Sequence, residues 1–332
     1  MGELSERREQ TAARLKRMRE GLSEAEELAH GKACVYATGS YGRGEACEHS
    51  DLDLFIVGRG RTSDGQPRRR SMLSRLDEIC IKADLIHLTR ELGIEDFSGE
   101  GEYLEHYSVD DLTKSVGARD DDSANTLTAR LLLLLEGAPL VGAEIYSEMI
   151  EEVVSAYWRD FEDHRNCFVP AFLANDILRL WRTFCVNYEA RTLRDPPDKK
   201  AKGKLKNYKL KHSRMLTCYS ALLMLLFQFK IKQTVRPGDA VAIARLAPTE
   251  RLEILLQREQ AAAAHPAIRQ LLERYEKFLA VTNAPEHELL QRFSTADFVT
   301  KRFKEAAEFG DSMADALHKL GDGNRFYRLL VV

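Results

Sequence analysis

The chain has 332 residues, of which 44% are hydrophobic and 30% are charged, and its formal net charge is −3. This length supports two domains with buried cores. The slightly acidic balance excludes a protein that coats nucleic acid non-specifically, because that role needs a broadly basic surface. The net charge does not exclude a local basic site that binds nucleic acid.

The first ninety residues predict a small mixed α/β core. The N-terminal thirty residues are charged with spaced leucines and methionines, which favours a helix or a helix pair, and Ser23 with Glu26 three residues later predicts a capping box. A polar loop with glycine and proline is expected at 59–70. Three β-prone runs are expected to form strands, at 33–38, 52–57 and 79–88.

From about residue 125 onward the pattern is helical. Apolar residues between Leu173 and Tyr188 recur at the spacing of one helix face. Further helical patterns cover 249–280 and 296–319. We therefore predict an α+β protein, with a mixed-sheet domain over 1–150 and an all-helical domain over 151–332.

Segment Met215–Phe229 is apolar around its whole circumference, which predicts a buried central helix. Its 15 residues are fewer than the ~20 that span a bilayer, and the N-terminus lacks the apolar stretch of a signal peptide. The six cysteines show no C-x-x-C pair and no zinc spacing, as is typical of reduced thiols. We predict a cytoplasmic protein with no membrane partner.

The segment that indicates chemistry is 39–57, GSYGRGEACEHSDLDLFIV. Gly39 and Ser40 follow a predicted strand, where small residues let backbone amides approach a phosphate and the Ser40 hydroxyl adds a donor. Asp51 and Asp53 follow, and residues i and i+2 of a strand point to the same face. Two such carboxylates repel each other unless a cation lies between them. Oxygen ligands of this kind suit Mg²⁺ or Mn²⁺, which also bridges substrate phosphates.

A third carboxylate would complete a two-metal site for in-line phosphoryl transfer. Asp84 is the candidate, because it interrupts the β-prone run 79–88, where a buried charge needs a partner. A strand beside 52–57 would bring Asp84 to Asp51 and Asp53. Asp77 and Glu78 precede this run on a predicted helix and are the weaker candidates.

Other polar residues near the motif have simpler interpretations. Arg43 and Glu45 are expected to form an intramolecular ion pair. His49 and His87 flank the acidic positions, and we expect surface or supporting places for them.

The run Lys199–Arg214 holds seven lysines and one arginine in 16 residues. It is interpreted either as a solvated loop or as a segment that reaches phosphate. In the second case we expect Lys206, Lys209 or Lys211 to contact the triphosphate of a nucleotide, and an RNA acceptor is the alternative ligand.

The motif GS-Y-GRGE…SDLDLF resembles the signature of the DNA polymerase β-type nucleotidyltransferase superfamily. The resemblance covers 35–57 and 81–87, and more weakly 126–142. Within this superfamily, the chain is most similar to the stand-alone bacterial group, which includes the minimal nucleotidyltransferases and the transferase module of PII uridylyltransferase. The resemblance implies metal ligands at Asp51, Asp53 and Asp84, and phosphate contacts at Gly39 and Ser40.

Membership would imply transfer of a nucleoside monophosphate from a nucleoside triphosphate, ATP by default, to an acceptor hydroxyl with release of pyrophosphate. The domain over 1–150 would then be the catalytic domain, and the helical domain over 151–332 would wall the nucleotide cleft. The acceptor stays open between a protein, a small molecule, RNA and a second nucleotide, the last in a second-messenger synthase. A non-catalytic antitoxin or nucleotide sensor on the same fold is the alternative from another class.

Overall fold

The computed structural model describes residues 2–61, 70–97, 104–119, 121–192, 196 and 199–331. These residues form two compact units, Glu3–Asp160 and Phe161–Val332. The boundary proposed from the sequence, residue 150, lies inside helix α7 (Ala143–Tyr157) of the first unit. Most of the loop expected at 59–70 lies outside the described residues.

The first unit contains a mixed sheet of four strands in the order β3-β2-β1-β4. Strand β1 runs antiparallel to both β2 and β4, and β2 runs parallel to β3. The strands are β1 (Ala33–Ala37), β2 (Leu54–Gly58), β3 (His106–Ser108) and β4 (Ala138–Val141). The predicted α+β class, with a small mixed sheet and a helical C-terminal region, is confirmed.

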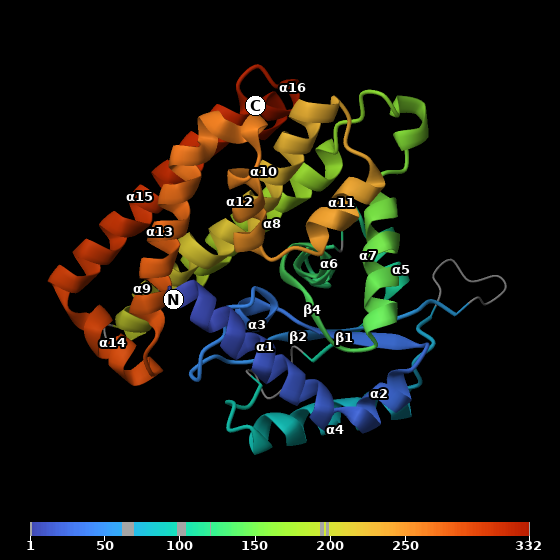
Figure 1. Ribbon diagram of the computed structural model, residues 1–332. Coiled ribbons are helices and arrows are strands. Elements are labelled where there is room, and N and C mark those ends of the chain that lie inside the picture. Colours follow the sequence, from blue (N-terminus) through green and yellow to red (C-terminus); the bar gives the residue numbers. More distant parts are fainter. Residues whose placement is uncertain are drawn as a thin grey trace. The chain divides into compact units, whose positions relative to one another are not determined.

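Helices cover both faces of this sheet (Figure 1). Val35, Leu54 and Ile56 point to one face and form a core with apolar side chains of α1, α2 and α4. Tyr36 and Phe55 point to the opposite face, where the Tyr36 hydroxyl donates to a carbonyl of α6. The helices are α1 (Glu3–Gly21), α2 (Ser23–Ala29), α3 (Gly39–Gly42), α4 (Arg75–Glu91), α5 (Val109–Lys114), α6 (Thr126–Glu136) and α7.

The prediction of a strand at 79–88 is wrong, because these residues belong to α4. The Ser74 side chain accepts a hydrogen bond from the Asp77 amide at 3.1 Å and caps the helix. The buried residues Ile81, Leu85 and Leu88 are spaced as one face of a helix. A β-prone composition misled the prediction, whereas the spacing of the buried positions decided the structure. The strand beside β2 is β3, and β4 was also missed.

The capping box predicted at Ser23 and Glu26 is also wrong. Helix α2 begins after Leu22 and has no side-chain cap. The carboxylate of Glu26 instead accepts a hydrogen bond from the amide of Gly142, at 2.9 Å. This contact joins α2 to the turn before α7.

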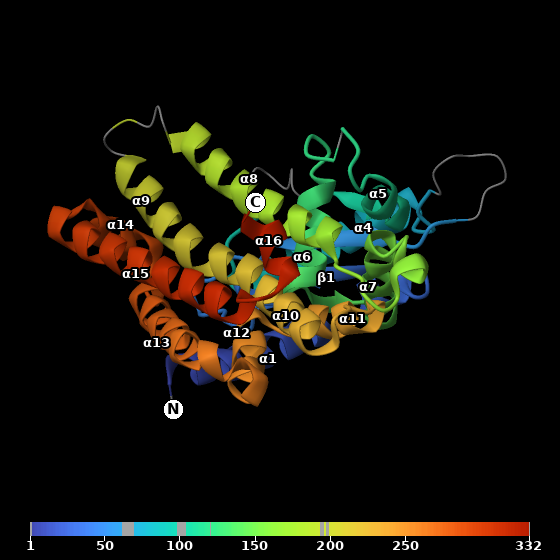
Figure 2. The same cartoon turned by 90° about the horizontal axis from the view of Figure 1, so that it is seen from above.

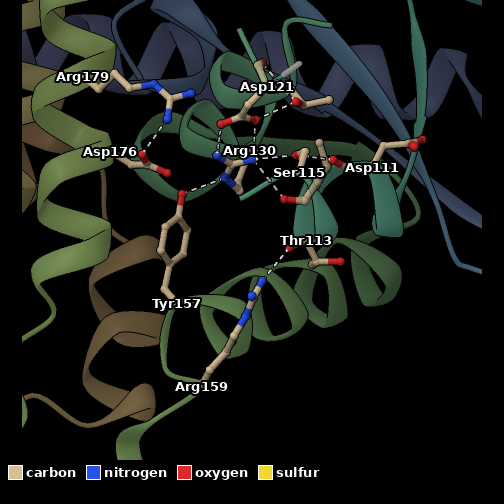
Figure 3. A network of polar contacts seen from close by, with 11 residues as sticks. Asp111, Thr113, Ser115, Asp121, Arg130, Tyr157, Arg159, Asp176 and Arg179 are labelled. Carbon is tan, nitrogen blue, oxygen red and sulfur yellow. Dashed lines mark hydrogen bonds and ion pairs between the residues drawn. The ribbon is translucent and has the colours of Figure 1, made fainter. Parts of the chain in front are cut away.

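A buried ion pair joins the helices on the Tyr36 face (Figure 3). Arg130 of α6 pairs with Asp121 at 2.8 Å, and both side chains are fully buried. Its guanidinium also donates to the Tyr157 hydroxyl at 2.7 Å, to the Leu112 carbonyl and to the Ser115 hydroxyl. Burial alone disfavours the charge of Arg130, but the hydrogen bonds to Asp121 and Tyr157 raise its pKa above the ordinary value.

The second unit is helical in the part that the structure describes. Helices α9, α14 and α15 lie side by side (Figure 2). Helix α10 has buried residues around its whole circumference, as predicted. The helical segments are η2 (Phe161–His164), α8 (Ala171–Thr192), α9 (Lys200–Lys209), a π-helical segment (Leu210–Arg214), α10 (Met215–Lys232), α11 (Pro237–Ala244), α12 (Pro248–Leu256), η5 (Glu259–Ala264), α13 (His265–Thr282), α14 (Glu286–Ser294), α15 (Ala296–Gly321) and α16 (Arg325–Val331).

One continuous helical segment, Lys200–Lys232, has the length and composition of a membrane span. Because 67% of its most apolar window is buried inside the protein, its environment is that of a core helix. The lysine-rich run is therefore helical and not a loop. The two consecutive prolines at 196–197 predict a break between helices at 195–198. These residues lie outside the described ones, except for residue 196.

Candidate functional site

The turn after β1 has the shape expected of a phosphate-contacting loop. Thr38 is extended, and its amide donates to the Asp53 carbonyl at 2.8 Å, which continues the pairing of β1 with the chain before β2. Gly39 then adopts φ +64°, a left-handed conformation that favours glycine. The short helix α3 begins at this residue.

Asp51 and Asp53 point to one side of the sheet. They are exposed and alternate with Leu52 and Leu54, which are buried in the core formed with α4. The two carboxylates therefore project toward the Tyr36 face. A Cβ atom added to Gly39 would lie 3.0 Å from Oδ2 of Asp53. The glycine turn and the D-x-D pair thus meet at one place, as the sequence predicts.

The Ser40 hydroxyl is buried and has no hydrogen-bond partner among the described residues. A buried hydroxyl without a partner costs about 1–3 kcal/mol. A ligand that accepts a hydrogen bond from Ser40 would recover this cost.

The amide of Gly39 donates to a carboxylate of the protein itself. It bonds to Oε1 of Glu136, the last residue of α6, at 3.0 Å. Oε2 of Glu136 accepts from Arg43 at 2.9 Å, and Arg43 also pairs with Glu45 at 3.0 Å. The ion pair predicted between Arg43 and Glu45 is present. The interaction with Glu136 was missed, because 97 residues separate it from Gly39.

Helix α1 holds the segment that joins the two parts of the motif. Arg7 and Arg14 donate to the carbonyls of Glu45 and Cys47, at 2.9 and 2.7 Å. Backbone carbonyls that are bonded in this way fix the course of the chain between the turn and the aspartates.

The structure does not bring Asp84 to the other two aspartates. Asp84 lies on α4, and α4 packs on the sheet face opposite to Asp51 and Asp53. The sheet therefore lies between them, and the predicted three-aspartate cluster is not formed. The cluster was predicted because residues 79–88, which include Asp84, were expected to form a strand beside β2.

Glu105 is an acidic residue that the sequence analysis missed. The parallel register pairs Ile56 with His106, so Glu105 lies beside Phe55 and on the same face as Asp53. Its carboxylate accepts a hydrogen bond from the Tyr107 hydroxyl at 2.7 Å. Burial first, and then the bond to Glu105, raise the pKa of Tyr107. The signal was the short run LEHYSV, which has too few residues to predict a strand.

Within the described ranges, no three His, Cys, Asp or Glu side chains lie close enough to hold a metal ion. Mg²⁺ needs fewer protein ligands, since it is commonly held by one or two carboxylates together with water and substrate phosphates. The exposed pair of Asp51 and Asp53 fits that donor set, together with the buried Ser40 hydroxyl, which has no partner in the part of the chain that the structure describes.

The three lysines predicted to contact nucleotide belong to the second unit. Lys206 and Lys209 are exposed on α9. Lys211 is half-buried in the π-helical segment, with its ammonium 5.2 Å from the ring centre of Phe303. Their contact with a triphosphate stays a prediction.

A comparison with protein families places part of the chain in a known family. Residues 15–115 match the family described as "Nucleotidyltransferase domain". The matched range covers the end of α1, the turn, both aspartates and β3. No curated protein matches the chain.

Proposed function

We propose that the chain transfers a nucleoside monophosphate from a nucleoside triphosphate to an acceptor hydroxyl in a metal-dependent reaction. Residues 15–115 match the nucleotidyltransferase domain family, which is consistent with the DNA polymerase β-type superfamily. The observation that carries the proposal is the meeting of the Gly39 turn with Asp53, where only 3.0 Å separates an added Cβ from the carboxylate. A ligand that uses one element therefore reaches the other.

Each residue of the site has a task in this proposal. Asp51 and Asp53 would hold Mg²⁺ or Mn²⁺ through their carboxylates. A divalent cation bound there supplies positive charge that neutralises the triphosphate and lowers the pKa of the acceptor hydroxyl. The Ser40 hydroxyl, which is buried and makes no hydrogen bond within the described ranges, would donate to a phosphate oxygen. The Gly39 turn would lie along the phosphates.

The transfer forms one bond and breaks one. The acceptor oxygen bonds to the α-phosphorus, the bond from that phosphorus to the bridging oxygen breaks, and pyrophosphate leaves with the electron pair. The acceptor proton needs a base. We assign that task to Glu105, which lies on the same sheet face as Asp53 and is exposed.

ATP is the donor by default, and the acceptor is a protein, a small molecule, RNA or a second nucleotide. Lys206, Lys209 and Lys211 would contact the triphosphate. The cysteine pattern and the buried α10 support a cytoplasmic location.

The test compares single variants in a labelled-nucleotide assay. Asp51→Ala and Asp53→Ala should each abolish transfer from labelled ATP in the presence of Mg²⁺ or Mn²⁺, measured as label on protein, RNA or small products. Asp84→Asn is the matched control, because this aspartate lies on a helix on the other side of the sheet. It should keep wild-type transfer.

The outcomes separate the candidate functions. Transfer that survives in both alanine variants would contradict the metal-site assignment. Label in a product made of two nucleotides would identify a messenger synthase. Nucleotide binding without any transfer, in every metal, would identify a sensor or antitoxin.

The lysines are tested by replacing Lys206, Lys209 and Lys211 together with alanine. We expect a higher KM for ATP and no change in the kind of acceptor. If the lysines hold RNA instead, the wild type should bind a short RNA with a steep salt dependence. The triple variant should flatten that slope by roughly two units, at about 0.7 per contact. A gel-shift titration at several salt concentrations distinguishes the two results.

A further inference from the structure

Helix α3, which forms the Gly39–Ser40 turn, is in contact with Glu136 at both of its ends. Its carboxylate accepts the Gly39 amide through Oε1, at 3.0 Å, and the side chain is fully buried. The opposite end of α3 rests on the same residue, since a Cβ added to Gly42 would lie 1.8 Å from the Glu136 carbonyl oxygen. Both ends of the short helix therefore depend on the position of Glu136.

The charge of Glu136 is balanced inside the protein. Arg43, which directly follows α3, bonds to Oε2 of Glu136 and to Oε2 of Glu45. All three side chains are at most 7% exposed. Two buried carboxylates that share one guanidinium need correct geometry, because a buried charge that loses its partner is strongly unfavourable. This requirement restricts the places that Arg43 and α3 can take.

The other end of the network is tied to α1. Arg7 donates to the carbonyl of Glu45 at 2.9 Å, and Arg7 is itself buried. The turn is thus connected to α6 through Glu136 and to α1 through Glu45. The exposed Asp53 carboxylate lies directly above Gly39, so a shift of the turn would change its place relative to the metal ligand.

Glu136 also determines which donors remain for a ligand. The Gly39 amide carries one hydrogen, and that hydrogen is already bonded to Glu136. The Ser40 hydroxyl has no partner among the described residues. A phosphate at the turn would therefore be bound through Ser40, while Gly39 serves to hold the turn.

We infer that Glu136 is a positioning residue of the nucleotide site, which fixes the Gly39–Ser40 turn against Asp53 through the Gly39 amide and Arg43. The kinetic test of this inference rests on the proposed function, because it measures nucleotide transfer. The hydrogen bonds that carry it are tested without any nucleotide.

The experiment compares Glu136→Gln with Glu26→Gln. A carboxamide has one acceptor oxygen, so it serves Gly39 or Arg43 but not both. Glu26 makes the same kind of contact, to the amide of Gly142, a glycine with φ +65°, but away from the turn and at an exposed position. Glu26→Gln is therefore the matched control, because it also removes a carboxylate that accepts a hydrogen bond from the amide of a glycine with positive φ.

We expect Glu136→Gln to raise the KM for ATP by about tenfold or more, as for the loss of a charge-assisted hydrogen bond. Glu26→Gln should stay within about twofold of wild type. A general loss of stability would lower kcat through the folded fraction and leave KM unchanged. Equal KM values in Glu136→Gln and wild type, or equal rises in both variants, would overturn the inference.

Amide hydrogen exchange tests the hydrogen bond between Gly39 and Glu136 directly, without nucleotide and without any transfer activity. In the wild type without nucleotide, the Gly39 amide should exchange as slowly as the Gly142 amide, and Glu136→Asp, one methylene shorter, should speed exchange at Gly39 alone. Fast exchange at Gly39 in the wild type would overturn the inference. Slow exchange in a protein that transfers no nucleotide would support the hold by Glu136 and refute the proposed function.

Discussion

Replacing Gly39 by alanine tests how closely the turn and the D-x-D pair must fit. Gly39 has φ +64°, and a left-handed alanine costs about 1–2 kcal/mol. The added Cβ would lie 3.0 Å from Oδ2 of Asp53. The carboxylate is the end of a side chain and can rotate away, at about 0.5–1.5 kcal/mol for an off-rotamer angle. The protein should fold, with Asp53 displaced.

Gly31→Ala is the control, because the chain has nearly the same backbone angle there, φ +65°, and no atom lies within 4 Å of the added Cβ. Gly31→Ala should lower the melting temperature of the first unit by roughly 2–8 °C, since each kcal/mol corresponds to about 2–4 °C for a domain of this size. Gly39→Ala should lower it by roughly 3–14 °C, because the cost of rotating Asp53 is added. Gly31→Ala should transfer nucleotide like the wild type.

Gly39→Ala should transfer at least about 100-fold more slowly, as for a misplacement of about 1 Å at a reacting centre. The assay is pyrophosphate release with ATP and Mg²⁺, next to a thermal melt of each variant. Equal turnover in the two alanine variants would refute the reasoning, because of these two glycines Gly39 belongs to the turn and lies against Asp53, whereas Gly31 does not.

Three further results are expected. Arg130→Met should lower the free energy of unfolding by about 3–5 kcal/mol in denaturant titrations, because the buried charge of Asp121 loses the guanidinium that balances it, and adding Asp121→Asn should restore part of it. Burial lowers the pKa of His212 from 6.5 to about 4, so the unfolded chain binds the proton first. Stability should therefore fall as the pH drops from about 6.5 to about 4, by up to about 1.4 kcal/mol per pH unit, and His212→Phe should remove this slope. A non-hydrolysable ATP analogue should raise the melting temperature only with divalent metal, and an equal rise in excess EDTA would contradict a bridging metal.

The mistakes at Asp84 and Glu105 have one physical cause. The run ICIKADLIHL is rich in residues that favour strands, and its helical spacing is visible only in which positions are buried. The strand β3 has three residues and takes its conformation from pairing with β2. A segment so short carries almost no periodic signal of its own, so its neighbour in space decides it.

Local features of the site were predictable from the sequence. Gly39 must adopt a conformation that favours glycine, and Asp51 and Asp53 share a face because strand side chains alternate. The close ion pair between Arg43 and Glu45 also depends on neighbours in the chain. These properties follow from backbone geometry over a few residues, and they therefore survive in any fold that contains a strand, a turn and a second strand.

Only the tertiary structure decided which distant groups complete the site. Glu136 reaches the Gly39 amide across 97 residues, and Glu26 reaches Gly142 across 116 instead of capping its own helix. Such contacts depend on how helices pack on the two faces of the sheet. A carboxylate accepts a hydrogen bond from the buried amide that the packing brings next to it, because an unpaired buried amide is costly. The local sequence pattern does not predict which amide that will be.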